Sequence, residues 1–245
     1  MYSPCETEQL LKVLSMKKSV AVYLVATLLS QVVFAGAFDG PYVQLGIGGA
    51  NTTTQSSYSQ NNMRNLGYAD FNTSGGSFLG QVQAGYSQVF SGFNIAGNVF
   101  YNIGNQKSGG YSHTSIASST VTENISQNFK LKNTWGVSIE PGYYLGRESL
   151  GYLKVSYLNS TLNYGATYQM NINGTPDTTS TQSGQKSMNG IGFGLGLKQG
   201  LTENLFAFAE YQYVQYGKSS DVLFSSDISY KPNQNYGWFG VGYRF

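Results

Sequence analysis

The sequence is short of charged residues, and this shortage excludes several classes of protein. Only 11% of its 245 residues are Asp, Glu, Lys or Arg, whereas a soluble globular domain carries about 25%. The formal net charge is +2, and the few scattered Lys and Arg make no basic stripe, so we expect no nucleic-acid partner. Intrinsic disorder is excluded as well, because disordered chains are poor in aromatic residues and 15% of this chain is aromatic.

Cysteine, histidine and long apolar runs are also scarce. The one cysteine is Cys5, so the rest of the chain forms no disulfide within itself and offers no thiolate nucleophile or Cys metal ligand. The one histidine is His113. No apolar run of about 20 residues follows residue 35, which excludes a bundle of membrane helices.

Glycine and aromatic residues are abundant, with 31 Gly, 20 Tyr and 14 Phe. The mean hydropathy is nevertheless -0.24, because Ser, Thr, Asn and Gln take the place of the missing charges. This composition indicates a β protein that does without a charged surface.

The N-terminal part has the pattern of a secretory signal peptide. Met16 is followed by Lys17 and Lys18, then by an apolar run over residues 20–29 and by the small-x-small pattern Ala35-Gly36-Ala37. The alternative is a membrane anchor, but the run is short and is broken by Ser30 and Gln31. We therefore expect residues 1–37 to be an N-terminal extension and signal peptide, with Met16 as the true start and cleavage near Ala35 or Ala37. Residues 38–245 are then one domain.

Beyond residue 40, eight segments alternate apolar and polar residues with period two, which predicts β-strands. They cover residues 42–47, 78–86, 93–103, 129–140, 153–157, 191–197, 207–213 and 239–245. In the fourth segment the alternation assigns Phe129 and Leu131 to the same face as Trp135. Lys130 and Lys132 then share the opposite face with Glu140.

The connections between these segments alternate between short and long. Short ones lie at 88–92, 146–150 and 200–204, and long polar ones at 51–75, 104–128, 165–187 and 217–234. Such long connections are uncommon in compact domains but usual in transmembrane β-barrels, which have short periplasmic turns and long external loops. A soluble barrel or sandwich is the alternative, but it requires charged outward faces that the alternation does not supply. We therefore predict an all-β, eight-stranded, antiparallel, up-and-down transmembrane β-barrel.

The C-terminal segment, residues 235–245, resembles the last strand of small Gram-negative outer-membrane barrels. Phe239, Val241, Tyr243 and Phe245 stand at every second position, the pattern that serves as the assembly signal in that family. Residues 38–43 are similar to the first strand of the OmpA transmembrane domain, OmpX and opacity-type "porin family" proteins. The resemblance implies a location in the bacterial outer membrane and no cofactor. It implies as partners the barrel-assembly machinery, periplasmic chaperones, membrane lipid and lipopolysaccharide, with a host or cell-surface ligand at the external loops.

Four charged residues fall on the inward faces of the predicted strands, namely Glu140, Lys154, Glu210 and Arg244. Charges in so narrow an interior must pair or face water. With the register set by the turn at 146–149, Glu140 opposes Ser156 and lies diagonal to Lys154, and Arg244 pairs with Glu210. This predicts a closed interior with a charge network; the alternative is a wet lumen with solvated charges.

Aromatic residues have two predicted places. Phe206 and Phe208 share a face with Glu210, and Phe208 is predicted to fill the space over the inward Gly196; alternatively both rings point to lipid, with a bulge before Glu210. The others form girdles at the two membrane interfaces. The periplasmic girdle comprises Tyr143, Tyr144, Tyr152, Tyr243 and Phe245, and the outer one Tyr101, Trp135 and Tyr213.

Catalytic and metal-binding patterns are weak. The nearest acid to His113 in the sequence is Glu123, and Asp221 and Asp227 are isolated, so we expect neither a catalytic nor a metal site. The sequence thus favours a non-enzymatic outer-membrane protein with a role in surface interaction, adhesion or envelope integrity through its external loops. A narrow porin is the alternative, and a lipid-modifying barrel enzyme acting through His113 a more distant one.

Overall fold

The structure is a computed structural model that describes residues 38–59, 69–223 and 226–245. The predicted signal peptide, its start and its cleavage site lie outside the described residues. No helix in the described ranges is long and apolar enough to cross a membrane.

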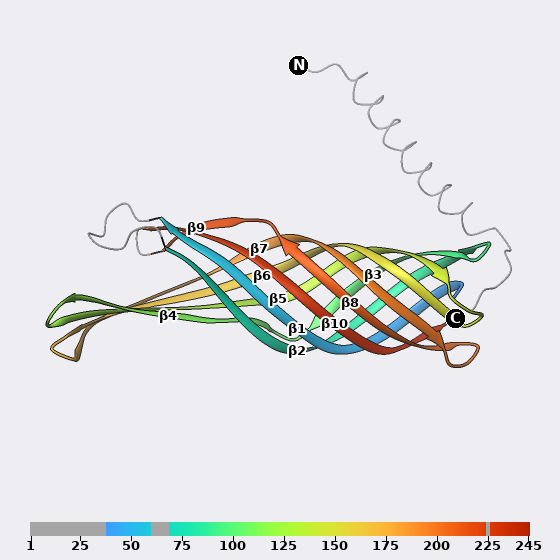
Figure 1. The fold of residues 1–245 in the computed structure, drawn as a ribbon, viewed down its shortest axis with the longest axis horizontal. Helices are drawn as coiled ribbons and strands as arrows, with labels where there is room; N and C mark the ends of the chain where they lie inside the picture. Colours follow the sequence, from blue (N-terminus) through green and yellow to red (C-terminus); the bar gives the residue numbers. More distant parts are fainter. Residues whose placement is uncertain (1–37, 60–68, 224–225) are drawn as a thin grey trace, which may run out of the picture. The chain divides into compact units, whose positions relative to one another are not determined.

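All secondary structure in the described ranges is β, in one closed sheet (Figure 1). The strands are β1 (Gly40–Ser59), β2 (Ala69–Phe90), β3 (Phe93–Ile103), β4 (Gln106–Ser118), β5 (Val121–Tyr144), β6 (Ser149–Ile172), β7 (Thr175–Gly200), β8 (Leu205–Tyr216), β9 (Ser219–Leu223) and β10 (Ser226–Arg244). The ring runs β1-β2-β3-β5-β6-β7-β8-β10 and closes through an antiparallel ladder between β1 and β10. β4 and β9 follow β3 and β8 after short breaks and pair with β5 and β10. The predicted eight-stranded antiparallel barrel is therefore confirmed.

The two ends of the barrel differ, as the short and long connections predicted. The three tight turns gather at the end where the C-terminus lies (Figure 1). One of them consists of Ser91 and Gly92, whose φ values of 46° and 89° suit a two-residue hairpin turn. The long connections extend the other end as β-hairpins, and the β6–β7 ladder continues to the pair Ile172 and Thr175. Thr, Ile and Tyr favour extended backbone, so these polar segments add strand outside the membrane.

The outside of the barrel carries an apolar belt, and the inside is polar. On each strand of the ring, one exposed apolar residue marks the edge of the belt farthest from the tight turns. In the order β1, β2, β3, β5, β6, β7, β8 and β10, these residues are Ile47, Phe78, Ile103, Trp135, Tyr157, Ile191, Tyr213 and Phe239. Inward positions on the same strands include buried Gln44, Gln83, Asn98 and Ser156. A soluble protein has the opposite distribution, and a transmembrane barrel has this one.

A bulge in β5 changes the predicted faces of that strand. Asn133 has a positive φ of 51°, and the register with β6 shifts between Lys132 and Trp135. Before the bulge the faces are exchanged, so Phe129 and Leu131 are buried inside and Lys130 is exposed outside. The assignment of these residues from strict alternation was wrong, because one extra residue reverses every face that precedes it.

The girdle predictions hold in part. Tyr143, Tyr243 and Phe245 are exposed near the tight-turn end, and Tyr101, Trp135 and Tyr213 are exposed toward the other end. Tyr144 is only partly buried and packs against the interior cluster. Tyr152 was misplaced: it is buried inside the barrel and 5% exposed.

A charge placed in the belt tests the inside-out arrangement. Val137 lies in the belt between Val99 and Tyr157, so Val137→Arg should lower the free energy of unfolding by about 2–4 kcal/mol. The measurement is denaturant unfolding of the protein in lipid vesicles. Val222→Arg, at an exposed position of β9 outside the belt, is the matched control and should change stability little. Equal effects of the two variants would contradict the assigned belt.

Candidate functional site

Four buried charges lie on four consecutive strands of the ring and meet inside the barrel. They are Glu140 of β5, Lys154 of β6, Lys198 of β7 and Glu210 of β8, each at most 5% exposed. Lys154 Nζ lies 3.0 Å from Glu210 Oε2 and 3.5 Å from Glu140 Oε1. Lys198 Nζ lies 2.8 Å from Glu140 Oε2. Two carboxylates and two ammonium groups thus form a neutral charge quartet.

Neutral polar groups complete the hydrogen bonds of the charge quartet. Glu140 Oε1 accepts bonds from Asn98 Nδ2 at 2.8 Å and Gln83 Nε2 at 3.2 Å. Tyr152 donates its hydroxyl proton to Glu210 Oε2 at 2.9 Å. Buried charges are tolerated when each is paired and hydrogen-bonded, and the quartet meets that condition.

Aromatic rings lie against both ammonium groups. Lys154 Nζ is 5.0 Å from the centre of the Phe100 ring. Lys198 Nζ is 4.7 Å from the Tyr42 ring centre and 4.8 Å from that of Tyr152. Such contacts stabilise a cation where water is excluded, and they leave little room for solvent around the charges.

The structure brings three of the four predicted interior charges together. Glu140, Lys154 and Glu210 meet, although in a different register. Ser138, not Glu140, pairs with Ser156, which places Glu140 opposite Lys154 instead of diagonal to it. The turn between β5 and β6 is longer than the one assumed, so the register slips by two residues and the faces stay the same.

Arg244 is not part of the charge quartet. Glu210 pairs with Trp238, six positions from Arg244, or about 20 Å along the strand. The Arg244 guanidinium instead donates to the carbonyl of Glu203 at 2.6 Å, at the tight-turn end. The predicted pair of Arg244 with Glu210 was therefore wrong, because the β8–β10 ladder separates the two residues.

The fourth member of the quartet, Lys198, was missed by the sequence reasoning. The sequence does carry a signal for it, because the alternation that assigns Gly196 inward continues to Lys198. The predicted strand ended at residue 197, one residue too early.

Inward aromatic rings cover glycines, as predicted, but with different partners. Phe206 and Phe208 are both buried inside. Phe208 pairs with Lys198 and not with Gly196, so that predicted contact was wrong. A Cβ at Gly196 would instead overlap the Tyr152 ring, and one at Gly242 would overlap the Phe206 ring. Glycine is required at these positions because the rings occupy the space of a side chain.

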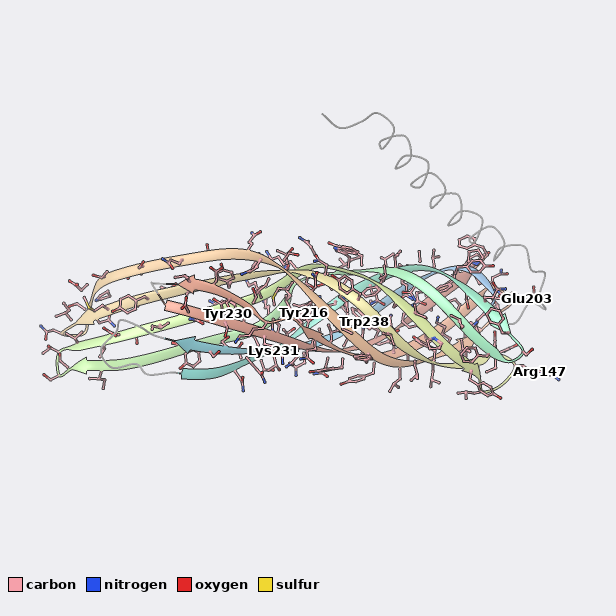
Figure 2. All side chains as sticks on the ribbon, turned by 90° about the horizontal axis from the view of Figure 1, so that it is seen from above. Arg147, Glu203, Tyr216, Tyr230, Lys231 and Trp238 are labelled. Carbon is pink, nitrogen blue, oxygen red and sulfur yellow. The ribbon has the colours of Figure 1, made fainter. Side chains whose placement is uncertain are left out.

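A second polar layer crosses the interior farther from the tight turns. Gln234 Nε2 donates to Gln106 Oε1 at 2.6 Å, and Tyr216 donates to Gln234 Oε1 at 2.9 Å. The hydroxyls of Tyr216 and Ser160 are 2.8 Å apart. Figure 2 shows Trp238, Tyr216 and Tyr230 at successive levels along the barrel, with Arg147 and Glu203 at the tight-turn end.

A small cavity lies near the tight-turn end. It has a volume of about 10 Å³ and is lined by Phe38, Tyr42, Ser87, Lys198, Phe206 and Arg244. That volume is at the lower limit for a single water molecule. The charge quartet, the second polar layer and the rings between them occupy the interior at these levels.

Outside the membrane, two contacts join β9 to β6 and β7. Tyr164 lies seven positions beyond Tyr157 and donates its hydroxyl proton to Asp221 Oδ2. Lys186 Nζ donates to the carbonyl of Ser220 at 2.6 Å. Burial, and then the bond to Asp221, raise the pKa of Tyr164 from 10.0 to about 12. The bond from Tyr164 lowers the pKa of Asp221.

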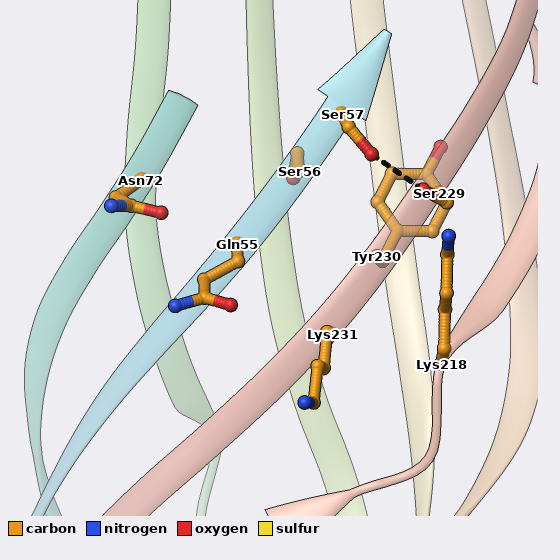
Figure 3. A pocket seen from close by; sticks show the side chains of 8 residues that line it. All are labelled: Gln55, Ser56, Ser57, Asn72, Lys218, Ser229, Tyr230 and Lys231. Carbon is orange, nitrogen blue, oxygen red and sulfur yellow. Dashed lines mark hydrogen bonds between the residues drawn. The ribbon is translucent and has the colours of Figure 1, made fainter. Parts of the chain in front are cut away.

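An open groove of about 390 Å³ lies on the outer extension (Figure 3). Its lining comprises Gln55, Ser56, Ser57, Asn72, Lys218, Ser229, Tyr230 and Lys231. The hydroxyls of Ser57 and Ser229 are 2.7 Å apart across the β1–β10 ladder. None of the eight lining residues is acidic, so the groove is basic.

The weak candidates from the sequence are His113 for catalysis and the isolated Asp221 and Asp227 for metal binding. His113 pairs with Ile125 in the β4–β5 ladder, and its side chain lies outside the described part. Among the described residues, no group of three or more His, Cys, Asp or Glu side chains is placed to hold a metal ion.

The sheet closes on itself, and its outer surface is an apolar belt above a polar interior. The described residues thus form a β-barrel with the apolar exterior and polar interior of a transmembrane barrel. No protein-family model and no curated protein matches the chain. Among solved structures, the chain is similar to Ail, the attachment invasion locus protein of Yersinia pestis. Identity is 17% over 84% of this chain and 99% of that one, with a TM-score of 0.33.

Two further solved structures are similar to the chain. Neisserial surface protein A is 19% identical over 82% of this chain and 97% of its own, with a TM-score of 0.35. The outer membrane protease OmpT from Escherichia coli is 7% identical over 87% of this chain and 99% of its own, with a TM-score of 0.45.

Removing one cation of the quartet should destabilise the barrel. In Lys198→Met, Lys154 is the one ammonium group left to pair with both Glu140 and Glu210, so one buried carboxylate charge is uncompensated. The substitution should therefore lower the free energy of unfolding by about 3–5 kcal/mol. Adding Glu140→Gln restores neutrality and should recover part of that loss, as measured by a double-mutant cycle of unfolding in vesicles. Lys107→Met, at an exposed position of β4, is the control. A Lys198→Met protein as stable as the control would contradict the quartet.

The contact between Tyr164 and Asp221 can be read from a titration. Asp221→Asn removes the carboxylate and should lower the pKa of Tyr164 from about 12 toward 10.0. Because the folded pKa of Tyr164 is raised, the contact's contribution is present at neutral pH and is lost as pH rises through about 12. Because the same bond lowers the pKa of Asp221, the contribution is also lost when that carboxylate becomes protonated at low pH. NMR titration of ring-labelled tyrosine measures it. Asp227→Asn is the matched control, and a Tyr164 pKa that both substitutions leave unchanged would refute the contact.

Proposed function

We propose that this protein is a non-enzymatic surface protein of the outer membrane. Its role is surface interaction, adhesion or envelope integrity, carried by the outer extension of the barrel. The observation that carries the proposal is the contrast between a filled interior and strands that continue far beyond the membrane.

The filled interior argues against a narrow porin. A solute would have to separate the quartet, in which both lysines are ion-paired and lie against aromatic rings. It would then have to cross the amide and hydroxyl layer around Gln106 and Gln234. Breaking a buried ion pair costs several kcal/mol, and passage therefore requires a rearrangement of the interior.

The outer extension supports a role at the surface. A transmembrane β-strand needs about 9–11 residues, whereas β5, β6 and β7 have 24, 24 and 26 residues. More than half of each of these strands therefore lies outside the membrane. Exposed, ordered and mostly neutral polar strands offer a large surface for contacts with other molecules.

The C-terminal strand supports the proposed route of assembly. Phe239, Val241 and Tyr243 are exposed on the outside of β10 and alternate with inward residues, and Phe245, directly after the strand, is exposed as well. We infer that the barrel-assembly machinery reads this exposed row, with periplasmic chaperones holding the chain beforehand.

Planar-bilayer recording separates the proposed function from a porin. The purified protein should show no large, steady conductance, because both polar layers stay closed. Glu140→Gln combined with Lys198→Met removes one ion pair and serves as the comparison for an altered interior. Large, steady currents through the unmodified protein would overturn the closed-interior proposal.

Shortening the outer extension tests the surface role. An Asn-Gly turn in place of residues 166–182 joins the paired Gly165 and Ser183 and removes the tip of the β6–β7 hairpin. The barrel should still form, as shown by a heat-modifiable gel shift. Cells that carry the shortened protein should lose adherence or survival in detergent relative to cells with equal amounts of the full chain. Retention of both properties would count against the proposal.

A further inference from the structure

Four exposed lysines stand on the outer wall of the extension, in two pairs on different parts of the ring. Lys107 of β4 and Lys130 of β5 are direct partners in the ladder, and both are exposed. Lys218 and Lys231 line the groove on the other pair of strands (Figure 3). Ser219 pairs with Tyr230, which sets Lys218 beside Lys231.

Both pairs join like charges across neighbouring strands, which is unfavourable unless an anion lies between them. None of the four ammonium groups makes an ion pair or hydrogen bond with a residue that the structure describes. The arrangement is repeated on two parts of the wall. An anionic ligand accounts for both pairs.

The height of the lysines above the belt indicates which anion. They lie four to eight positions beyond the outermost belt residues of their strands, which are Ile103, Trp135, Tyr213 and Phe239. With about 3.3 Å per residue and a tilt of about 40°, this is about 10–20 Å above the belt. All four lysines are exposed at this height. At this height the wall faces the saccharides of the surrounding glycolipid.

Most acids of the outer extension occupy a different level. The exception is Asp221 of β9, eight positions beyond Tyr213, whose carboxylate accepts the hydroxyl proton of Tyr164. Glu123, Asp177 and Asp227 stand 12 to 14 positions beyond the belt on their strands. Asp70 lies opposite Ser57 on β2, two strands from Lys231. The lysine pairs thus lie closer to the membrane than most of these acids.

The groove adds hydrogen-bond groups to its lysine pair. Gln55 pairs with Lys231 on one side and with Asn72 on the other, so an amide row continues from the cations. The Ser57 and Ser229 hydroxyls lie in the same groove. Ammonium groups bind a phosphate ester as point charges, and amides and hydroxyls bind the hydroxyl groups of a sugar.

We propose that the two lysine pairs bind the phosphorylated saccharide of neighbouring lipopolysaccharide molecules. One phosphate ester lies between Lys218 and Lys231 in the groove, and another between Lys107 and Lys130. The inference rests on the proposed function, since it names the partner of the outer extension. Fixed contacts to the surrounding glycolipid would hold the extended strands against the surface of the membrane and contribute to envelope integrity.

Binding of purified lipopolysaccharide to the full-length protein in detergent tests the proposal. The Lys→Gln double variants K107Q/K130Q and K218Q/K231Q should each weaken binding about tenfold, and the quadruple variant more. Arg147→Gln removes an exposed cation at the tight-turn end and should bind like the unmodified protein. Lipopolysaccharide stripped of phosphate should bind the unmodified protein as weakly as the quadruple variant binds the intact lipid.

Three results would overturn the proposal. The first is that the quadruple variant binds intact lipopolysaccharide as tightly as the unmodified protein does. The second is that the unmodified protein binds phosphate-free lipopolysaccharide as tightly as the intact lipid. A soluble sulfated or phosphorylated glycan that competes fully at equal phosphate or sulfate concentration would assign the site to soluble ligands instead. A conducting interior would refute the proposed function and leave this binding result standing, so the two failures are distinguishable.

Discussion

Within the hydrocarbon layer, every backbone N–H and C=O must find its partner in the chain itself. The ladder from β1 to β10 meets this constraint, because it joins the first and last strands of the ring along their whole length. Closure also divides all side chains into two sets. One set faces lipid and is apolar; the other faces a narrow interior and must satisfy its polar groups there.

The charge quartet follows from that division. Four charged side chains on consecutive strands have no access to bulk water, so each carboxylate lies against an ammonium group. The two ion-paired carboxylates and the rings of Tyr42, Tyr152 and Phe100 pack the interior at the level of the charge quartet. Since the inside is occupied by the contacts that hold the barrel together, its surface chemistry is left to the strands beyond the membrane.

The sequence was sufficient for the faces of most strands and for the topology, because period-two alternation is a local property. Register across a turn is not local. The position of Glu140 relative to Lys154 depended on how many residues the turn uses, and the separation of Arg244 from Glu210 depended on the whole β8–β10 ladder. Lys198 was within reach of the same alternation, which needed only one more residue at the end of its strand.

The bulge at Asn133 explains why strict alternation gives the wrong faces for the preceding residues of β5, and this exchange of faces has a structural benefit. Without it, Lys130 and Lys132 would enter an interior in which the two carboxylates of the quartet already have their ammonium partners, and two buried positive charges would be left uncompensated. Asn tolerates the positive φ that the bulge requires. The exchange of faces instead buries Phe129, whose ring packs against Tyr230, and places Lys130 opposite Lys107 on the outer wall. One residue therefore keeps the interior neutral and supplies the exterior with a cation pair.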